Sequence, residues 1–178
     1  MTIFIGSLAA GIYNPALTLI NTTFLVPHVV WQVLLPMIAR QQYHTRLLRW
    51  VVGLTSVGNL VYGGFWALVF WYAADWLVLH VYDEQYLAAA PLLQIMFLIP
   101  LFKSFNFCWT TLMVAHDAQV RRTTLQAIGA VFSIAANLMF LPVYGLLAAA
   151  WVNVAAEIIL FVCYGYGAWY TLRPRSAH

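Results

Sequence analysis

Long apolar runs alternate with short polar segments along the whole chain. We expect five membrane-crossing helices from this pattern, at residues 15–38, 51–72, 88–114, 123–141 and 146–172. A helix rises about 1.5 Å per residue, so roughly 20 residues cross the ~30 Å hydrocarbon core of a bilayer. The pattern therefore predicts an all-α, polytopic membrane protein.

Prolines and glycines mark the interruptions that we expect within and between these helices. Pro15 is suited to a helix start, whereas Pro27 is expected to kink the first span and Pro100 to interrupt the third. The segment 142–145 (Pro-Val-Tyr-Gly) predicts a turn that ends the fourth span. Residues 75–81 are expected to form a short helix at the membrane interface.

Charged residues lie almost wholly between the apolar runs. With 64% hydrophobic and only 7% charged residues, the chain lacks the charge needed to cover a water-facing surface. Every second inter-span segment is basic; the arginines concerned are Arg40, Arg46, Arg49, Arg121, Arg122, Arg173 and Arg175. By the positive-inside rule, these segments and the C-terminus are expected in the cytoplasm, with residues 75–85 on the far side.

Lys103 stands out because it lies within the third apolar run. A cation at that depth costs roughly 3 kcal/mol or more to insert, so it is expected to face a cavity or a partner. Asn106 and Thr110 share its helical face. Glu157, in the fifth span, lies at a depth that differs by only ~6 Å, so we expect the two charges to lie near one another. A charged interior of this kind favours a role in transport.

Further polar residues extend this candidate binding cavity. Asn153 lies one helical turn before Glu157, and His28 and Gln32 lie on one stripe of the first span. The second span carries Ser56, Asn59 and Gly63, and the fourth carries Gly129, Ser133 and Asn137, a row of small residues that would let helices approach closely. For Asn59, Ser133 and Asn137, hydrogen bonding between helices is the favoured interpretation.

The sequence offers no pattern that predicts catalysis or a cofactor. Cys108 and Cys163 lie within apolar runs, where isolated cysteines usually pack as small hydrophobes, so we expect no disulfide and no metal. No nucleophile triad or phosphate-binding loop can be assembled, so we do not expect an enzyme. The net charge of +3 comes from arginines between the spans and does not indicate nucleic-acid binding.

Four short motifs follow one another along the chain. They are GIYNPA at 11–16, VLLP at 33–36, the stretch 82–93 with its Glu-Gln-Tyr and Ala-Ala-Ala-Pro, and NLMFLPVYG at 137–145 followed by three alanines at 148–150. In this order they resemble the motifs of the polysaccharide flippases of the multidrug/oligosaccharidyl-lipid/polysaccharide exporter superfamily. The resemblance implies a fold of roughly a dozen helices in two bundles. This chain would supply most of the second bundle, as the C-terminal portion of a longer transporter that also has an N-terminal bundle.

The same resemblance implies a function and partners. The family translocates lipid-linked oligosaccharides by alternating access, for the synthesis of cell-surface polysaccharides such as O-antigen. The expected ligand is then a polyprenyl-pyrophosphate-linked oligosaccharide in the inner (plasma) membrane, whose anionic head Lys103 would attract. Membrane lipids and polysaccharide-assembly proteins are the other partners that it implies.

Two alternatives remain open at the level of sequence. In the first, the chain belongs to a cation-coupled drug or metabolite antiporter of the same superfamily, with Glu157 as a proton or sodium site. In the second, it is a non-transporting membrane scaffold of a glycan-assembly complex, although it offers no large soluble segment on which an enzyme could dock.

Overall fold

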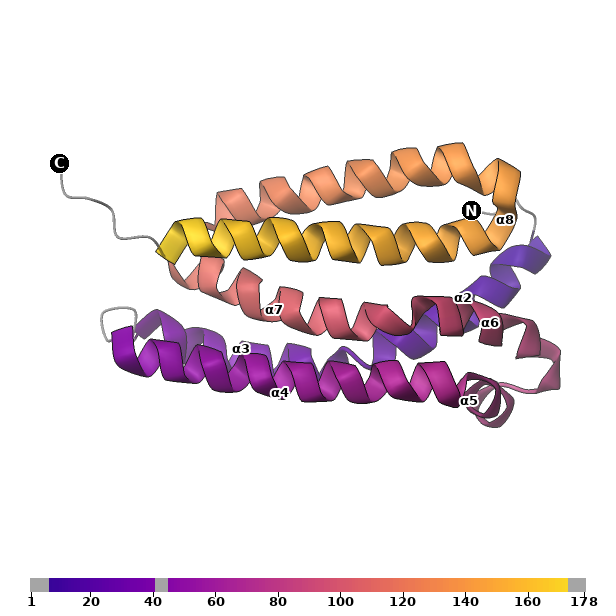
Figure 1. Cartoon of the computed structure of the whole chain (residues 1–178), viewed down its shortest axis with the longest axis horizontal. Helices are drawn as coiled ribbons and strands as arrows, with labels where there is room; N and C mark the ends of the chain where they lie inside the picture. The colour runs from indigo at the N-terminus through magenta and orange to yellow at the C-terminus, as the bar shows by residue number, and fades with distance from the viewer. Residues whose placement is uncertain (1–6, 41–44, 173–178) are drawn as a thin grey trace.

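The computed structural model describes residues 7–40 and 45–172, and almost all of these residues are helical. The long helices run side by side along one axis, and α5 lies across it at one end (Figure 1). In chain order the elements are α2 (Ser7–Thr22), α3 (Leu25–Arg40), α4 (Thr45–Tyr72), α5 (Ala74–Val81), the 3₁₀ turn η1 (Glu84–Ala89), α6 (Ala90–Ile95), the 3₁₀ turn η2 (Met96–Leu98), α7 (Ile99–Ala115) and α8 (Gln119–Leu172).

Four helical stretches among the described residues are long and apolar enough to cross a membrane, at 11–36, 53–72, 84–114 and 119–170. The last of them reverses at Gly145, whose φ of 63° and ψ of −146° are non-helical. A residue with a side chain pays a steric penalty at positive φ, which glycine avoids. We call residues 119–144 the first leg of α8 and residues 146–172 its second leg; the two run antiparallel (Figure 1). The predicted all-helical class is confirmed, with helices long and apolar enough to span a membrane. The turn predicted at 142–145 lies at this reversal.

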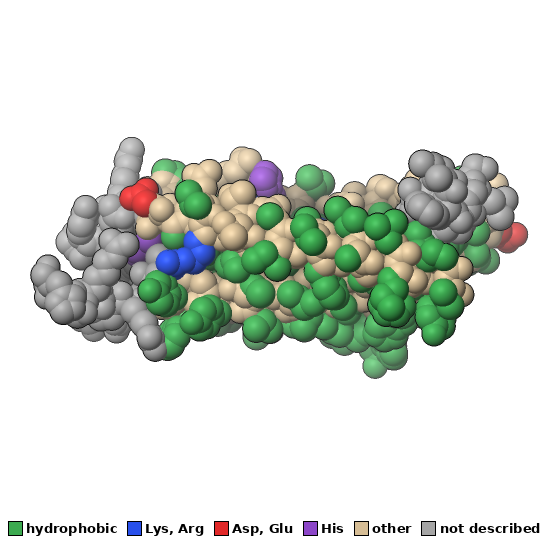
Figure 2. Space-filling model, turned by 90° about the horizontal axis from the view of Figure 1, so that it is seen from above, with side chains coloured by type: hydrophobic (Ala, Val, Ile, Leu, Met, Phe, Trp, Pro, Cys, Tyr) green, Lys and Arg blue, Asp and Glu red, His purple; other side chains and the backbone are tan. Residues whose placement is uncertain are grey.

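Apolar side chains cover most of the length of the face shown in Figure 2, and the charged side chains visible there lie near the two ends. Large apolar residues remain exposed on α3, α4 and both legs of α8, for example Val33, Phe65, Val131 and Val162. In water so much exposed apolar surface would drive association, whereas in a bilayer it faces lipid. This surface therefore agrees with a membrane environment.

Helix α2 begins at Ser7 and continues through Pro15, so the prediction that Pro15 starts the first helix is wrong. Proline removes one backbone hydrogen bond, and neighbouring groups in membrane helices tolerate that loss. Eight residues of α2, at 7–14, precede the proline, so the helix begins about two turns before it.

The first span is broken at Thr23 and Phe24, four and three residues before Pro27, rather than at the proline itself. Pro27 has no N–H to donate to the carbonyl of Thr23, and its ring crowds that carbonyl. The hydroxyl of Tyr62, on α4, donates to the freed Thr23 carbonyl at 2.6 Å. The effect of Pro27 thus appears one turn earlier than the sequence predicts, and α4 supplies the missing donor.

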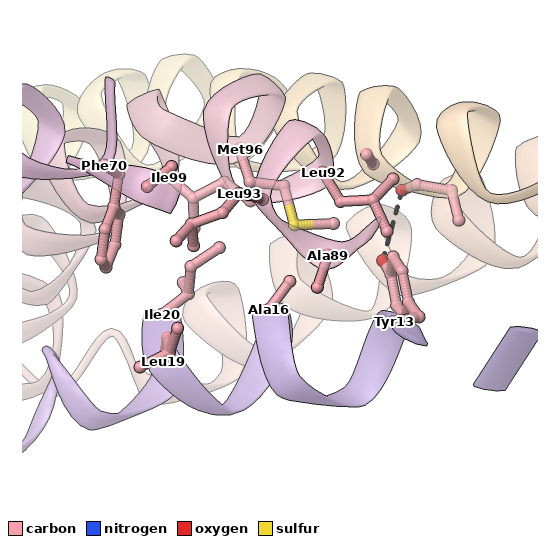
Figure 3. Packing of buried hydrophobic residues seen from close by; sticks show 14 of the residues in the cluster. Tyr13, Ala16, Leu19, Ile20, Phe70, Ala89, Leu92, Leu93, Met96 and Ile99 are labelled. Atoms are coloured by element: carbon pink, nitrogen blue, oxygen red, sulfur yellow. Dashed lines mark hydrogen bonds between the residues drawn. The ribbon is translucent and has the colours of Figure 1, made fainter. Parts of the chain in front are cut away.

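The largest buried cluster joins α2 to α6, η2 and the end of α4. Figure 3 shows Ala16 and Ile20 of α2 pointing toward Leu93 and Met96, with Phe70 beside them. Between membrane helices such contacts act through close packing and less through the exclusion of water. This cluster therefore fixes how α2 sits against the segment that leads into α7.

A glycine sets the distance between α4 and α7. A Cβ atom on Gly63 would lie 2.8 Å from Leu101 Cα and 2.9 Å from the Pro100 carbonyl oxygen. Both contacts are with backbone, which has little room to move, so the approach of the two helices requires glycine at position 63.

The segments that carry the arginines lie at one end of the bundle. The end of α3, the start of α4, the α7–α8 connection and the end of α8 share that end, while α5 and the Gly145 reversal lie at the other (Figure 1). Which end faces the cytoplasm stays a prediction based on the arginine bias.

A labelling experiment tests that orientation. We expect Gln85→Cys to react with a membrane-impermeant thiol reagent on intact cells and Gln119→Cys to react only after permeabilisation, because both positions are exposed at opposite ends of the bundle. Gln42→Cys, outside the described residues, should behave like Gln119→Cys. The background protein would carry Cys108→Ala and Cys163→Ala. Labelling of Gln119→Cys with Gln85→Cys silent would reverse the orientation.

Candidate functional site

Lys103 and Glu157 form an ion pair between α7 and the second leg of α8. The Lys103 Nζ lies 3.6 Å from Glu157 Oε1, which confirms the predicted proximity of the two charges. The Glu157 side chain is 16% exposed and the Lys103 side chain 35% exposed. The carboxylate is thus largely enclosed, while the ammonium keeps one open side.

Phe24 supplies a second contact to the lysine. The Lys103 Nζ lies 4.5 Å from the centre of the Phe24 ring, a cation–π contact that stabilises an ammonium by about 0.5–2 kcal/mol depending on its hydration. Phe24 belongs to the break between α2 and α3. Sequence reasoning missed this residue because an aromatic residue in an apolar run carries no signal of its own.

Asn106 holds the other oxygen of the carboxylate. Its Nδ2 donates to Glu157 Oε2 at 3.0 Å, and the Asn106 side chain is buried. The Oδ1 atom of the same amide is buried and has no hydrogen-bond partner among the described residues. We refer to Phe24, Lys103, Asn106 and Glu157 as the ion-pair cluster.

Thr110 shares the face of Asn106 but does not join the cluster. Its hydroxyl donates to the Asn106 carbonyl of its own helix at 2.8 Å. Such a bond back to the preceding turn satisfies the hydroxyl within the membrane. Of the three residues predicted to share one face of α7, only Lys103 and Asn106 therefore contact Glu157.

His28 and Gln32 lie on the exposed side of α3 and contact each other, with 2.9 Å between their Nε2 atoms. The His28 ring lies 6.2 Å from Phe107, and Phe107 lies 6.4 Å from Phe24. Two aromatic rings thus separate this pair from the lysine. Within the described part of the chain, no contact joins either residue directly to the charges of the cluster.

Asn153 lies one turn before Glu157 but contacts a different helix. Its Nδ2 donates to the Tyr13 hydroxyl at 2.5 Å, and that hydroxyl lies 3.5 Å from the Ala149 carbonyl oxygen (Figure 3 draws the latter contact). Asn137, expected to hydrogen-bond between helices, instead donates to the Ser133 carbonyl of its own leg at 2.8 Å. Tyr13 was not expected at a polar site, because the sequence alone does not show which helix Asn153 faces.

These polar residues border a pocket of about 360 Å³ between α2 and the two legs of α8. It is lined by Tyr13, Ser133, Ile134, Asn137, Leu138, Leu141, Pro142 and Asn153. We call it the amide pocket. It is separate from the ion-pair cluster, although Asn153 and Glu157 lie on the same leg.

Across residues 7–40 and 45–172, no three His, Cys, Asp or Glu side chains gather as a metal site would require. Cys108 and Cys163 are free thiols, and the Cys108 Sγ lies 3.2 Å from the Ser56 hydroxyl oxygen. Burial and the contact with Ser56 thus account for the Cys108 thiol.

Comparisons with protein-family models, with curated proteins and with solved structures find no match to this chain. Its function is therefore inferred from its own residues and from the motif resemblance described above.

Proposed function

We propose that this chain is the membrane-embedded part of a transporter that flips a lipid-linked oligosaccharide by alternating access, and that the ion-pair cluster binds the anionic head of that ligand. The support is the order of the flippase-like motifs together with the chemistry of Lys103. A membrane-spanning segment that keeps a lysine pays for its insertion, so the charge is expected to serve a ligand or a pathway.

The single observation that carries the proposal is the unequal enclosure of the ion pair. Lys103 remains 35% exposed while Glu157 is 16% exposed, so an incoming anion reaches the ammonium before it reaches the carboxylate. A pyrophosphate carries more negative charge than one carboxylate and competes well for a cation in a low-dielectric site. Attraction of the head group to Lys103 is the expected first contact.

An exchange of the Lys103 partner, from Glu157 to the pyrophosphate, would then link ligand binding to movement of the helices. When Lys103 turns to the pyrophosphate, Glu157 keeps its hydrogen bond from Asn106 at 3.0 Å but loses its counter-charge. The restraint between α7 and the second leg of α8 is thereby weakened. A ligand shifts a conformational equilibrium only by such differences in its contacts, and this exchange supplies one.

The antiporter alternative is favoured by one observation, the largely enclosed carboxylate of Glu157 within a membrane helix. If that carboxylate bound a proton or Na⁺, transport would depend on the ion gradient and Glu157→Gln would abolish the dependence. In the flippase proposal Glu157→Gln is milder, because Lys103 can still meet an anion.

The proposal can be tested by introducing variants into the gene of the native host and measuring whether each variant restores surface-polysaccharide synthesis. We expect Lys103→Met to abolish complementation and Lys103→Arg to retain part of it, because methionine has a similar length but no charge. The double variant Lys103→Met, Glu157→Gln leaves no unpaired charge and should fold, yet it should still fail to complement. Full complementation by the double variant at wild-type membrane abundance would refute the anion site.

A further inference from the structure

The amide pocket lies between three helical segments and is large enough for a small organic group. Its volume of about 360 Å³ falls within the range of roughly 300–1,000 Å³ that is typical of ligand sites. Tyr13 comes from α2, Asn153 from the second leg of α8, and the remaining lining residues from the first leg. A group bound there would contact all three segments at once.

Four of the lining side chains form hydrogen bonds, and none of the eight lining residues is charged. The Asn137 and Asn153 amides each use one N–H in the bonds described above. The Asn137 Nδ2 also lies 3.4 Å from the Ser133 hydroxyl oxygen. Each amide has an oxygen that can accept, and among the described residues neither oxygen has a hydrogen-bond partner. The Ser133 hydroxyl adds a donor.

This lining selects the chemistry of the occupant. An acyl chain needs no hydrogen-bonding groups, and amides turned toward lipid would be unfavourable. An anion would be expected to meet a basic side chain, and the lining has none. Amides and hydroxyls both donate and accept, which matches the alternating donors and acceptors of neighbouring hydroxyl groups.

We infer that the amide pocket binds an uncharged, hydroxyl-rich group, such as one sugar ring of the ligand. This inference rests on the proposed function. Asn153 precedes Glu157 by four residues, about 6 Å along the helix axis. A ligand with an anionic head at Lys103 can therefore place an adjoining neutral ring against Asn153, Asn137 and Ser133. The sugar portion and the charged portion of the ligand have separate recognition sites on one leg of α8.

Binding of four small isoprenoid probes to the purified protein tests this assignment. The protein is held in nanodiscs of zwitterionic phospholipid, because sugar-based detergents would compete. The probes are farnesol, farnesyl β-glucoside, farnesyl pyrophosphate and the same pyrophosphate bearing N-acetylglucosamine. We expect the glucoside to bind about tenfold more tightly than farnesol, the gain from two or three hydrogen bonds. The sugar should improve binding of the pyrophosphate by a similar factor.

Paired variants separate a filled pocket from a damaged fold. Ser133→Leu fills the pocket and Asn137→Leu removes an amide, so each should bring the glucoside-to-farnesol ratio to about one. Val131→Leu, on the same leg but exposed and outside the pocket lining, should preserve the ratio. None of the three should change the affinity for farnesyl pyrophosphate, which also shows that the protein is folded.

The outcomes distinguish the two proposals. Equal binding of farnesol and its glucoside by the wild type would identify an acyl-chain pocket and overturn the inference, as would a sugar preference that survives both leucine variants. A sugar preference lost in both leucine variants supports it. If the glucoside binds in this way but Lys103→Met leaves pyrophosphate binding unchanged, the pocket stands and the anion site fails.

Discussion

Reversing the charge of Lys103 should greatly destabilise the protein. Lys103→Glu would place a second carboxylate beside Glu157, in place of the ammonium that now lies 3.6 Å from Oε1. Breaking a fully buried ion pair costs about 3–5 kcal/mol, and the 35% exposure of Lys103 reduces that cost. We expect a loss of a few kcal/mol, seen as a lower midpoint for heat-induced aggregation when the purified protein is followed by fluorescence-detected gel filtration.

The charge exchange is the control for this prediction. In Lys103→Glu, Glu157→Lys the two charges are opposite again, so most of the lost stability should return. Glu157→Gln should be milder than Lys103→Glu, since glutamine still accepts a hydrogen bond from Asn106 and Lys103 keeps its contact with Phe24. If the exchanged protein were as unstable as Lys103→Glu, the ion pair would not be the source of the stability.

Adding one methyl group at Gly63 should separate α4 from α7. The new Cβ of Gly63→Ala would meet the backbone of Leu101 and Pro100 at 2.8 and 2.9 Å, and relieving such overpacking costs about 1–3 kcal/mol. The same heat-stability assay should show a clear decrease. Gly63→Val should be worse, because its branches extend the clash.

Gly64 provides a matched control on the next residue of the same helix. A Cβ atom there meets nothing within 4 Å, so Gly64→Ala removes only the backbone freedom of glycine. In a helix interior that change is neutral or stabilising by roughly 0.5–1 kcal/mol. Equal destabilisation by both alanine variants would show that the α4–α7 contact does not depend on position 63.

The positions of the helices follow from the sequence because the period and length of apolar runs are local properties. The span 51–72 falls within α4, and the predicted interfacial segment 75–81 falls within α5. The approximate depth of Lys103 and Glu157 in the membrane follows from the same local properties, so their proximity could be predicted. Depth along a helix depends only on residue count and the rise per residue.

The rotation of each helix about its own axis could not be predicted from the sequence. Asn153 and Glu157 lie one turn apart, yet one donates to Tyr13 and the other pairs with Lys103. Which neighbour a polar residue meets depends on long-range packing, here on the insertion of α2 beside α8. Hence Phe24 and Tyr13, both in an apolar segment, were missed although they complete the two sites.

Proline effects were also only partly predictable. The sequence shows that Pro27 removes one backbone hydrogen bond. The residues at which the helix breaks also depend on which side chain of another helix can donate to the freed carbonyl. Tyr62 of α4 provides that donor to Thr23, so the break lies before the proline. At Pro15 the helix continues because neighbouring packing holds it.

The reversal at Gly145 bears on how the protein enters its membrane. The tip of the α8 hairpin, from Leu141 to Ala148, contains no charged residue. Moving an arginine through the bilayer centre costs about 2.5–3.5 kcal/mol, and this tip is free of that barrier. Both legs can therefore insert together as one helical hairpin, with Arg121 and Arg122 at its base. Leu160 of the second leg packs against Gly129 of the first, so the hairpin has a stabilising contact between its own two legs.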